Sequence, residues 1–316
     1  MTAQINQART ASLYPNLNKV ASELRDLRIQ SHKTRYGGGA PPDLPSRKAI
    51  IEIVDGLAAV LFPRHFGPSG LAGESIDAYV RFVLAETAQS LQRQVQLELE
   101  LNNQEGAAAS ADHANDACQI SAAFIDELPT VRAQLESDIR AAYEGDPAAA
   151  SLDEVMCCYP GVAAIIRHRL AHGLYRLGAR MLARIISEVA HSTTGIDIHP
   201  GAQIGESFFI DHGAGVVIGE TAVIGRRVRL YQGVTLGARR FEAGDDGALL
   251  KNYRRHPTIG DNVVIYAGAT VLGPINVGTG STIAGSVWLT SSVPAGSIIT
   301  QAKALRSEDF DHGGGI

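Results

Sequence analysis

The residues of this 316-residue chain that are best suited to acid–base chemistry are histidines with acidic or basic neighbours. His212 directly follows Asp211, His199 lies two residues after Asp197, and His256 directly follows an arginine. An imidazole titrates near neutrality, and a carboxylate on its far nitrogen can orient it, so such a pair is the smallest unit that activates a hydroxyl group. Sequence spacing alone does not say which aspartate serves which histidine.

The segment that must position these residues has an unusual aliphatic spacing from Ile196 onward. Thirteen aliphatic residues recur six positions apart, except for one step of 8 and one of 23, and glycine follows many of them. A hexapeptide repeat explains this pattern, because six residues make one short strand and a turn, and three such sides close a triangular coil around the aliphatic side chains. We therefore predict about four coils. The thirteen residues are Ile198, Ile204, Ile210, Ile218, Ile224, Leu230, Leu236, Ile259, Ile265, Val271, Val277, Ile283 and Leu289.

The two longer steps contain the ionisable residues. The step of 8 includes Asp211 and His212, and the step of 23 runs from Gly237 through Pro257 and ends in Arg255-His256. An insertion into a regular solenoid has to leave at a corner and project outward. The sequence therefore predicts a cleft at an edge of the prism, beside a projecting loop over residues 237–257.

The residues before the repeats follow helical spacing. We predict helices over 48–62, capped by Ser46, and over 74–103, 118–146 and 161–191, with Pro129 ending or kinking the third. Residues 1–45 end in a stretch rich in glycine and proline and are expected to be flexible. The prediction is an α+β chain with a helical domain over 1–194, a β-helix over 195–300 and a flexible tail over 301–316.

Composition excludes several classes of function. The net charge of -5 offers no basic surface for nucleic acid or membrane lipid, and no segment has about 18 unbroken apolar residues. The three cysteines, Cys118, Cys157 and Cys158, are odd in number and form no CxxC pair, so neither a disulfide framework nor a zinc site is indicated. We expect a cytoplasmic protein with no nucleic-acid or membrane partner, in which Cys157 and Cys158 are buried packing residues.

Three motifs carry a family resemblance: IDIHPGAQIGESFFIDHGAGVVIGETAVIG, YQGVTLG and RHPTIGDNVVIYAGATVLGPINVG. Together with a DPA motif at Asp146 they resemble the serine acetyltransferases over roughly residues 146–300. The resemblance implies a left-handed parallel β-helix after a helical domain, assembled as a trimer or a dimer of trimers. It also implies acetyl transfer from acetyl-CoA to L-serine, the first committed step of cysteine biosynthesis, with L-cysteine as feedback inhibitor and no metal.

The resemblance assigns site residues motif by motif. It makes one histidine the general base, with an orienting aspartate, two aspartates and an arginine for the amino-acid substrate, and a further polar contact: His212, Asp197, Asp146, Asp211, Arg255 and His256. Acetyl-CoA is expected in a groove between neighbouring subunits, at small residues that let its arm approach the backbone: Gly237, Ala267, Gly268, Ala284 and Gly285. The acidic tail ends in three glycines and Ile316, like family tails that enter the active site of O-acetylserine sulfhydrylase.

Three other functions stay open on the sequence. Another hexapeptide acyltransferase would use a sugar, homoserine or an amino-sugar nucleotide as acceptor. A β-helix zinc enzyme of the carbonic-anhydrase type would use His199, His212 and His256 as ligands. A non-catalytic assembly protein would act through its tail.

Overall fold

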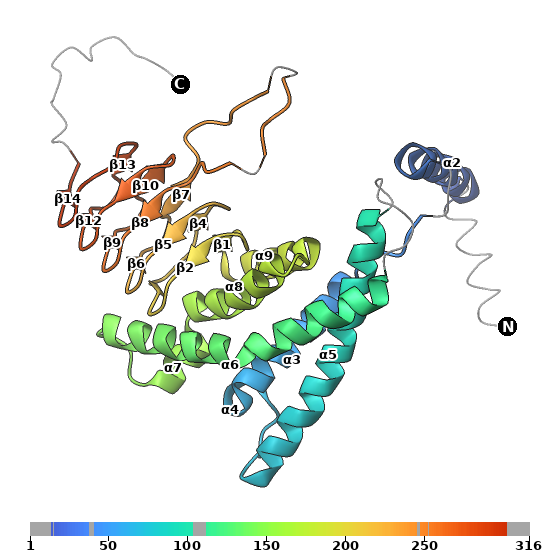
Figure 1. Cartoon of the computed structure of the whole chain (residues 1–316), viewed down its shortest axis with the longest axis horizontal. Helices are drawn as coiled ribbons and strands as arrows, with labels where there is room; N and C mark the ends of the chain where they lie inside the picture. The colour runs from blue at the N-terminus through green and yellow to red at the C-terminus, as the bar shows by residue number, and fades with distance from the viewer. Residues whose placement is uncertain are drawn as a thin grey trace.

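The chain forms a helical part followed by a stack of short parallel strands (Figure 1). The computed structural model describes residues 14, 16–37, 41–103, 112–244, 247–251 and 253–301. Within these ranges the helices are α2 (Leu17–Tyr36), α3 (Arg47–Leu61), α4 (Pro63–Phe66), α5 (Glu74–Asn103), α6 (His113–Gly145), α7 (Leu152–Cys158), α8 (Pro160–Arg176) and α9 (Arg180–Thr194).

Local signals explain where several helices begin. The Ser46 hydroxyl accepts a hydrogen bond from the backbone N–H of Ala49 at 3.3 Å, as predicted for the cap of α3. Asp112 and Ser151 cap α6 and α7 in the same way. The first 45 residues, which were expected to be flexible, include α2, none of whose side chains is buried.

Two helix boundaries differ from the prediction. Helix α6 continues through Pro129, because one missing N–H costs less than the packing of a long helix against α5 and α8 provides. The stretch 161–191 is two helices, because Gly178 adopts a φ of +96° and closes the end of α8 before α9 begins. Apolar residues keep helical spacing on both sides of the break, which is why one continuous helix was predicted there.

The prediction that Cys157 and Cys158 are buried packing residues was wrong. Cys118, Cys157 and Cys158 are all exposed free thiols. Cys157 and Cys158 occupy the last turn of α7, where Val155 and Met156 are the buried residues. A helix this short has one buried face, and the two cysteines fall outside it.

The strands are short, and from β1 to β13 they lie six residues apart except at the two longer steps, while β14 follows ten residues after β13. They are β1 (Asp197–Ile198), β2 (Gln203–Ile204), β3 (Phe209–Ile210), β4 (Val217–Ile218), β5 (Val223–Ile224), β6 (Arg229–Leu230), β7 (Thr235–Gly237), β8 (Thr258–Ile259), β9 (Val264–Ile265), β10 (Thr270–Leu272), β11 (Asn276–Val277), β12 (Thr282–Ile283), β13 (Trp288–Leu289) and β14 (Ile298–Ile299). Each of the thirteen predicted aliphatic residues lies on one of these strands, and all except Ile204 are buried.

The strands form three parallel sheets that are the sides of a prism. Their orders are β1-β4-β7-β10-β13, β11-β8-β5-β2 and β14-β12-β9-β6-β3, so each strand pairs with the one three strands later, except that β12 pairs with β14. Ile198 pairs with Ile218, for example, and Ile210 with Leu230. The predicted left-handed β-helix after a helical region is confirmed.

The prism has three edges, which we name by the strands they follow. Edge 1 is formed by the corners after β3, β6, β9 and β12, edge 2 by those after β1, β4 and β7, and edge 3 by those after β2, β5, β8 and β11. Every first corner position on edge 3 is glycine, because the next coil lies too close for a side chain: a Cβ on Gly225 would stand 2.4 Å from the Asp261 carboxylate. On edge 1 the same position holds Asp211, Tyr231, Tyr266 and Ala284.

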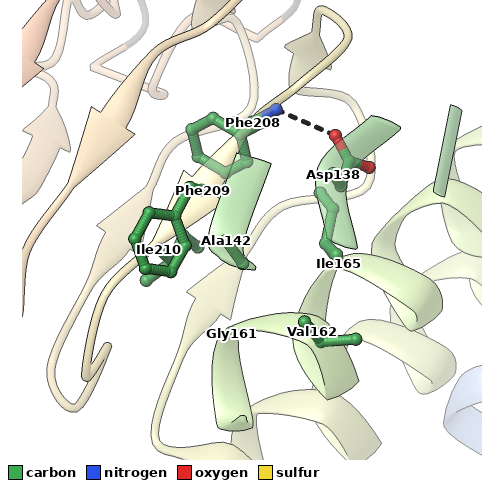
Figure 2. Close-up of a pocket in the computed structure, with 8 residues that line it drawn as sticks. All are labelled: Asp138, Ala142, Gly161, Val162, Ile165, Phe208, Phe209 and Ile210. Atoms are coloured by element: carbon green, nitrogen blue, oxygen red, sulfur yellow. Dashed lines mark hydrogen bonds between the residues drawn. The ribbon is translucent and has the colours of Figure 1, made fainter. Parts of the chain in front are cut away.

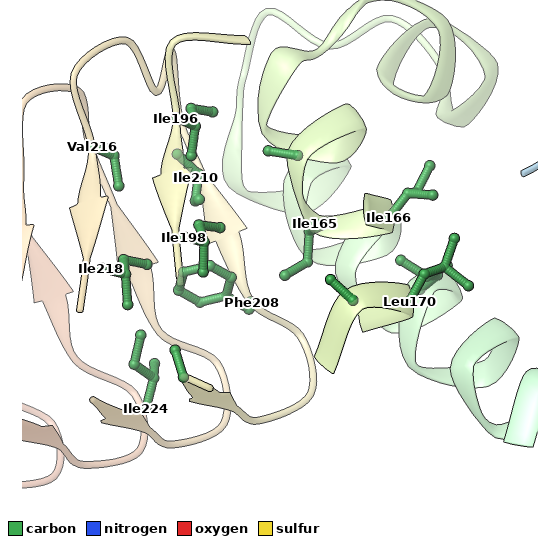
Figure 3. Packing of buried hydrophobic residues seen from close by; sticks show 14 of the residues in the cluster. Ile165, Ile166, Leu170, Ile196, Ile198, Phe208, Ile210, Val216, Ile218 and Ile224 are labelled. Carbon is green, nitrogen blue, oxygen red and sulfur yellow. The ribbon is translucent and has the colours of Figure 1, made fainter. Parts of the chain in front are cut away.

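The helical part covers the first coil of the prism. Figure 3 shows Ile165 of α8 on the side of the helix that faces Phe208 and Ile198 of the first coil, and these residues belong to one continuous apolar core. The close approach of α8 requires a glycine, since a Cβ on Gly161 would lie 2.3 Å from the carbonyl oxygen of Ile210. Because the helices cover this end of the prism, a groove along the prism can run in only one direction, away from the helices.

A buried ion pair fastens α6 and α8 to the first coil. Arg169 donates to Asp138 through Nε at 2.6 Å and Nη2 at 2.9 Å, and also to the carbonyl oxygens of Ile204 and Gly205. Asp138 accepts a third hydrogen bond, from the backbone N–H of Phe208 at 2.8 Å (Figure 2). Burial raises the pKa of the Asp138 carboxyl, against the opposing effect of Arg169.

Between β7 and β8 the described residues 238–244, 247–251 and 253–257 lie outside the prism, in the long excursion seen in Figure 1. Ala243 and Leu249 form an antiparallel bridge within it. Its return limb brings Arg255 and His256 back to edge 2, directly before β8. This excursion coincides with the loop predicted over 237–257.

Candidate functional site

Edge 1 carries the base candidate. Asp211 and His212 form the corner directly after β3, where Asp211 N–H donates to the Leu230 carbonyl oxygen at 2.8 Å. His212 adopts a φ of +57°, a conformation uncommon for residues other than glycine, and its side chain is 71% exposed. Ser207, Arg227, Asn262 and Ser286 adopt similar φ values of +54° to +58°, so the conformation recurs at corners of the prism. The corner therefore projects an imidazole from an otherwise aliphatic scaffold.

One predicted substrate carboxylate, Asp211, lies beside this imidazole, and a second, Asp146, follows Gly145, whose Cβ position would lie 3.7 Å from Arg229 Nη1. Asp211 Oδ1 is 3.8 Å from His212 Nε2, and Asp211 Oδ2 accepts a hydrogen bond from Arg229 at 2.7 Å. Asp146, the residue that ends α6, accepts from the Tyr159 hydroxyl at 2.5 Å and from the Ala148 N–H at 2.8 Å.

Electrostatics place Asp146 in the same group. The Tyr159 hydrogen bond lowers the pKa of the Asp146 carboxyl most, followed by the Ala148 N–H, with smaller contributions from Arg229 and His212. The same hydrogen bond raises the pKa of Tyr159 to about 12, so its hydroxyl is a donor at any assay pH. The structure thus gathers Asp146, Asp211 and His212 around Arg229. The two carboxylates of this group are suited to bind a substrate ammonium.

Asp197 is not bonded to this group within one chain. It lies on β1, pairs through its backbone with Val217, and is half-buried. Among the described residues its carboxylate forms no hydrogen bond or ion pair, including with His212. The His212–Asp197 pair stays a prediction.

Edge 2 holds the second group of predicted residues. Arg255 Nη2 donates to Glu220 Oε2 at 2.5 Å, and the Tyr175 hydroxyl donates to Glu220 Oε1 at 2.8 Å. Burial alone would raise the pKa of the Glu220 carboxyl, but the hydrogen bonds from Arg255 and Tyr175 outweigh it and the pKa is lowered. Glu220 therefore holds Arg255 in place and leaves other guanidinium N–H groups available for a second carboxylate.

His256 is fixed beside that arginine in a defined tautomer. Its Nδ1 accepts from the Thr221 backbone N–H at 3.0 Å, so the ring proton lies on Nε2 and can be donated. Its ring packs over Gly219, where a Cβ would come within 2.1 Å. Burial lowers the pKa of His256 to about 4, and burial likewise lowers that of His199 to about 4. Both rings are neutral near pH 7.

The two groups lie on different edges of the prism. Sheet β1-β4-β7-β10-β13 separates edge 1, with His212, from edge 2, with Arg255 and His256. No hydrogen bond or ion pair joins the groups among the residues described. His199 lies on edge 2 with His256 and apart from His212, so one chain does not gather the three histidines of the zinc hypothesis, and no cluster of metal-binding side chains occurs in the described part of the chain.

The small residues predicted to meet acetyl-CoA divide between the same edges. Ala267 and Gly268 form the corner after β9, and Ala284 and Gly285 the corner after β12, so all four continue edge 1 from His212. Gly237 ends β7 on edge 2. Ile316 lies outside the described residues.

Sequence reasoning missed Arg229, Tyr159, Glu220 and Tyr175. The hexapeptide register contains a signal for Arg229, since it pairs with Phe209, two residues before Asp211. Likewise Glu220 lies two residues after Ile218, which pairs with Ile198 directly before His199. Tyr159, between α7 and α8, and Tyr175, on α8, come from the helical part, whose contacts with the prism have no such signal.

A triangular β-helix with a histidine at one edge, small residues along it and an arginine at the next edge is the architecture of a hexapeptide-repeat acyltransferase. No family model matches the chain. It is 55% identical over 276 residues to a plasmid serine acetyltransferase of Synechococcus elongatus, covering 86% of each chain, and 50% identical over 165 residues to the serine acetyltransferase of Mycobacterium tuberculosis, covering 52% of this chain and 68% of that one.

Solved structures agree with the relatives. Serine acetyltransferase 1 of Entamoeba histolytica in complex with L-cysteine matches with a TM-score of 0.70 and 34% identity, over 92% of this chain and all of that one. The Neisseria gonorrhoeae enzyme in complex with serine matches with a TM-score of 0.52 and 26% identity, over 80% and 95%. The chain belongs to the serine acetyltransferase family, acyltransferases for which acetyl-CoA is the co-substrate. Among the described residues, no helix is long and apolar enough to cross a bilayer.

Proposed function

We propose that this chain acetylates the hydroxyl of L-serine by direct attack on acetyl-CoA, with His212 as general base. The observation that carries the proposal is the grouping of His212 with Asp146 and Asp211 on the edge that continues into Ala267–Gly268 and Ala284–Gly285. The grouping puts a base, anionic sites for an ammonium and an open backbone path for a long thioester at one place. The solved Neisseria relative, bound to serine, supports the choice of acceptor.

The site is proposed to form between two copies of the chain. A substrate with both an ammonium and a carboxylate needs Asp146 and Asp211 as well as Arg255, and these lie on separate edges of one prism. A cyclic trimer would place edge 1 of one copy against edge 2 of the next, and each site would then have both groups. Trimer and dimer of trimers satisfy this requirement equally.

The reaction follows from the residues. His212 takes the proton from the serine hydroxyl as its oxygen attacks the thioester carbonyl carbon, and Asp197 orients the ring and stabilises the imidazolium. When the tetrahedral intermediate collapses, the carbon–sulfur bond breaks and His212 returns the proton to the CoA thiolate. The products are O-acetyl-L-serine and CoA. No acyl-enzyme forms, so the exposed cysteines have no part in the step.

L-Cysteine is proposed to compete for the same pocket, because it presents the same ammonium and carboxylate as serine. The Entamoeba relatives solved with cysteine support this proposal. The tail ending in Ile316 is proposed to bind O-acetylserine sulfhydrylase, on the basis of its sequence alone.

The test is release of free thiol from acetyl-CoA with L-serine, L-homoserine and simple sugars compared side by side. We expect serine to be turned over far faster than the others. A preference for a sugar or for homoserine would overturn the proposed acceptor. Equal, slow release with every acceptor would overturn the enzymatic proposal itself.

A further inference from the structure

Edge 1 presents large side chains at a corner position that edge 3 fills with glycine. Backbone hydrogen bonds set this position in a column: Asp211 N–H donates to Leu230 O, Tyr231 N–H to Ile265 O and Tyr266 N–H to Ile283 O, at 2.8, 3.1 and 2.9 Å. Asp211, Tyr231, Tyr266 and Ala284 are therefore stacked one coil apart. Two tyrosines follow the carboxylate beside the base.

The two tyrosine rings form a rigid ladder. Their centroids are 5.0 Å apart and their planes differ by 9°. Arg229 lies 4.6 Å from the centroid of the Tyr231 ring and also donates a hydrogen bond to Asp211. It therefore links the tyrosine ladder to the carboxylate beside His212. Tyr266 remains 42% exposed. An aromatic surface fixed in this way loses little conformational entropy when it binds an apolar partner.

The corner positions that follow the tyrosine column on edge 1 carry mostly small residues. The column that begins at Ala214, two residues after His212, continues through Gln232, Ala267 and Gly285, because Gly233 N–H donates to Ala214 O, Gly268 N–H to Gln232 O and Ser286 N–H to Ala267 O. Beside it Gly233 and Gly268 approach closely, with a Cβ on Gly233 only 3.5 Å from the Gly268 backbone. Apart from Gln232, small residues thus line the surface beside the two tyrosines.

Only one direction along this edge is open. Helices α6, α8 and α9 pack against β1 and β3, so the helical part closes the end of the prism at which His212 lies. A long acyl donor whose thioester reaches His212 has to extend past Tyr231 and then Tyr266. These rings stand one and two coil spacings from the level of Asp211, about 5 and 10 Å.

We propose that Tyr231 and Tyr266 form the wall against which the pantetheine arm of acetyl-CoA packs, and that they set the affinity for the acyl donor. The inference rests on the proposed function. At about 5 and 10 Å from the thioester the arm, and not the nucleotide, is the part of the donor that lies beside the rings. Its methylene and methyl groups suit the aromatic faces, and its amides suit the tyrosine hydroxyls. Burial raises the pKa of Tyr231, which keeps its hydroxyl protonated.

The test is steady-state kinetics of the full-length Tyr266→Ala enzyme with acetyl-CoA and, separately, with S-acetyl-pantetheine, which lacks the nucleotide. We expect KM for either donor to rise about tenfold, while kcat and KM for serine change less than about twofold. Tyr266→Phe keeps the ring and should stay within about threefold of the parent enzyme. Trp288→Ala, which removes a 70% exposed aromatic residue on β13 that is not part of the ladder, is the matched control and should leave both KM values unchanged.

Several results would overturn the inference. An unchanged KM for acetyl-CoA would remove the ladder from the donor site, and a rise seen with acetyl-CoA but not with S-acetyl-pantetheine would assign it to the nucleotide. A change in oligomeric mass for Tyr266→Ala, measured by light scattering, would make the ladder a contact between subunits. Failure of the parent enzyme to acetylate serine would instead refute the proposed function.

Discussion

Replacing Arg169 with Met should strongly destabilise the chain, because Arg169 is the cation of the buried pair that joins the helices to the prism. Its side chain and that of Asp138 are 4% and 1% exposed. The variant leaves the Asp138 carboxylate without a counter-charge and two carbonyl oxygens, of Ile204 and Gly205, without donors. Removal of one partner of a buried pair costs about 3–5 kcal/mol, which corresponds to a fall in Tm on the order of 5–10 °C in a chain of this size.

The assay is thermal unfolding followed by circular dichroism, with Arg176→Met as control. Arg176 pairs with Glu127 at 2.6 Å but is 54% exposed, so its loss should cost no more than about 1 kcal/mol. Asp138 also lies on α6, the helix that ends at Asp146, so Arg169→Met should raise KM for serine as well. A fall in Tm no larger than that of the control would refute the idea that the pair anchors the two parts.

Three further changes test the site. His212→Ala should lower kcat on the order of a hundredfold or more, measured as thiol release at saturating serine, and a near-normal rate would remove it as base. Tyr159→Phe should raise KM for serine with little change in kcat, because Asp146 loses its shortest hydrogen bond, and the effect should vanish in an Asp146→Asn background. His199 and His256 have pKa values of about 4 in the folded chain and about 6.5 when unfolded, so the unfolded state binds more protons between these values. Stability should therefore be full above pH 6.5 and fall as pH is lowered towards 4; a flat profile of unfolding free energy over that range would contradict the burial of both rings.

The strand positions were predictable because each inward aliphatic residue repeats the same physical requirement. Every coil must fill the same narrow interior, so the step of six residues locates the strands from Ile198 to Leu289 directly. The break at Gly178 was not predictable in this way, since a glycine in an apolar helical pattern fits a helix interior as well as a helix end.

The partners in the site were less accessible from sequence. Asp146, which follows α6, and Tyr159, which lies between α7 and α8, are 13 residues apart and meet through the packing of these helices. A tyrosine at such a position carries no sequence signal for the partner of its hydroxyl. Sequence motifs grouped Arg255 with His212 as parts of one site. The topology instead assigns them to separate edges, which only the closing of three sides into a coil determines.

Mixing two inactive variants tests most directly whether one site needs two copies. His212→Ala damages edge 1 and Arg255→Ala damages edge 2, and each alone should have little activity. In mixed oligomers made by co-expression of differently tagged chains, an intact edge 1 meets an intact edge 2 at one interface of each mixed trimer, so activity should return to about one third of the parent rate. Mixed oligomers as inactive as the separate variants would show that both residues act within a single chain and would contradict the account.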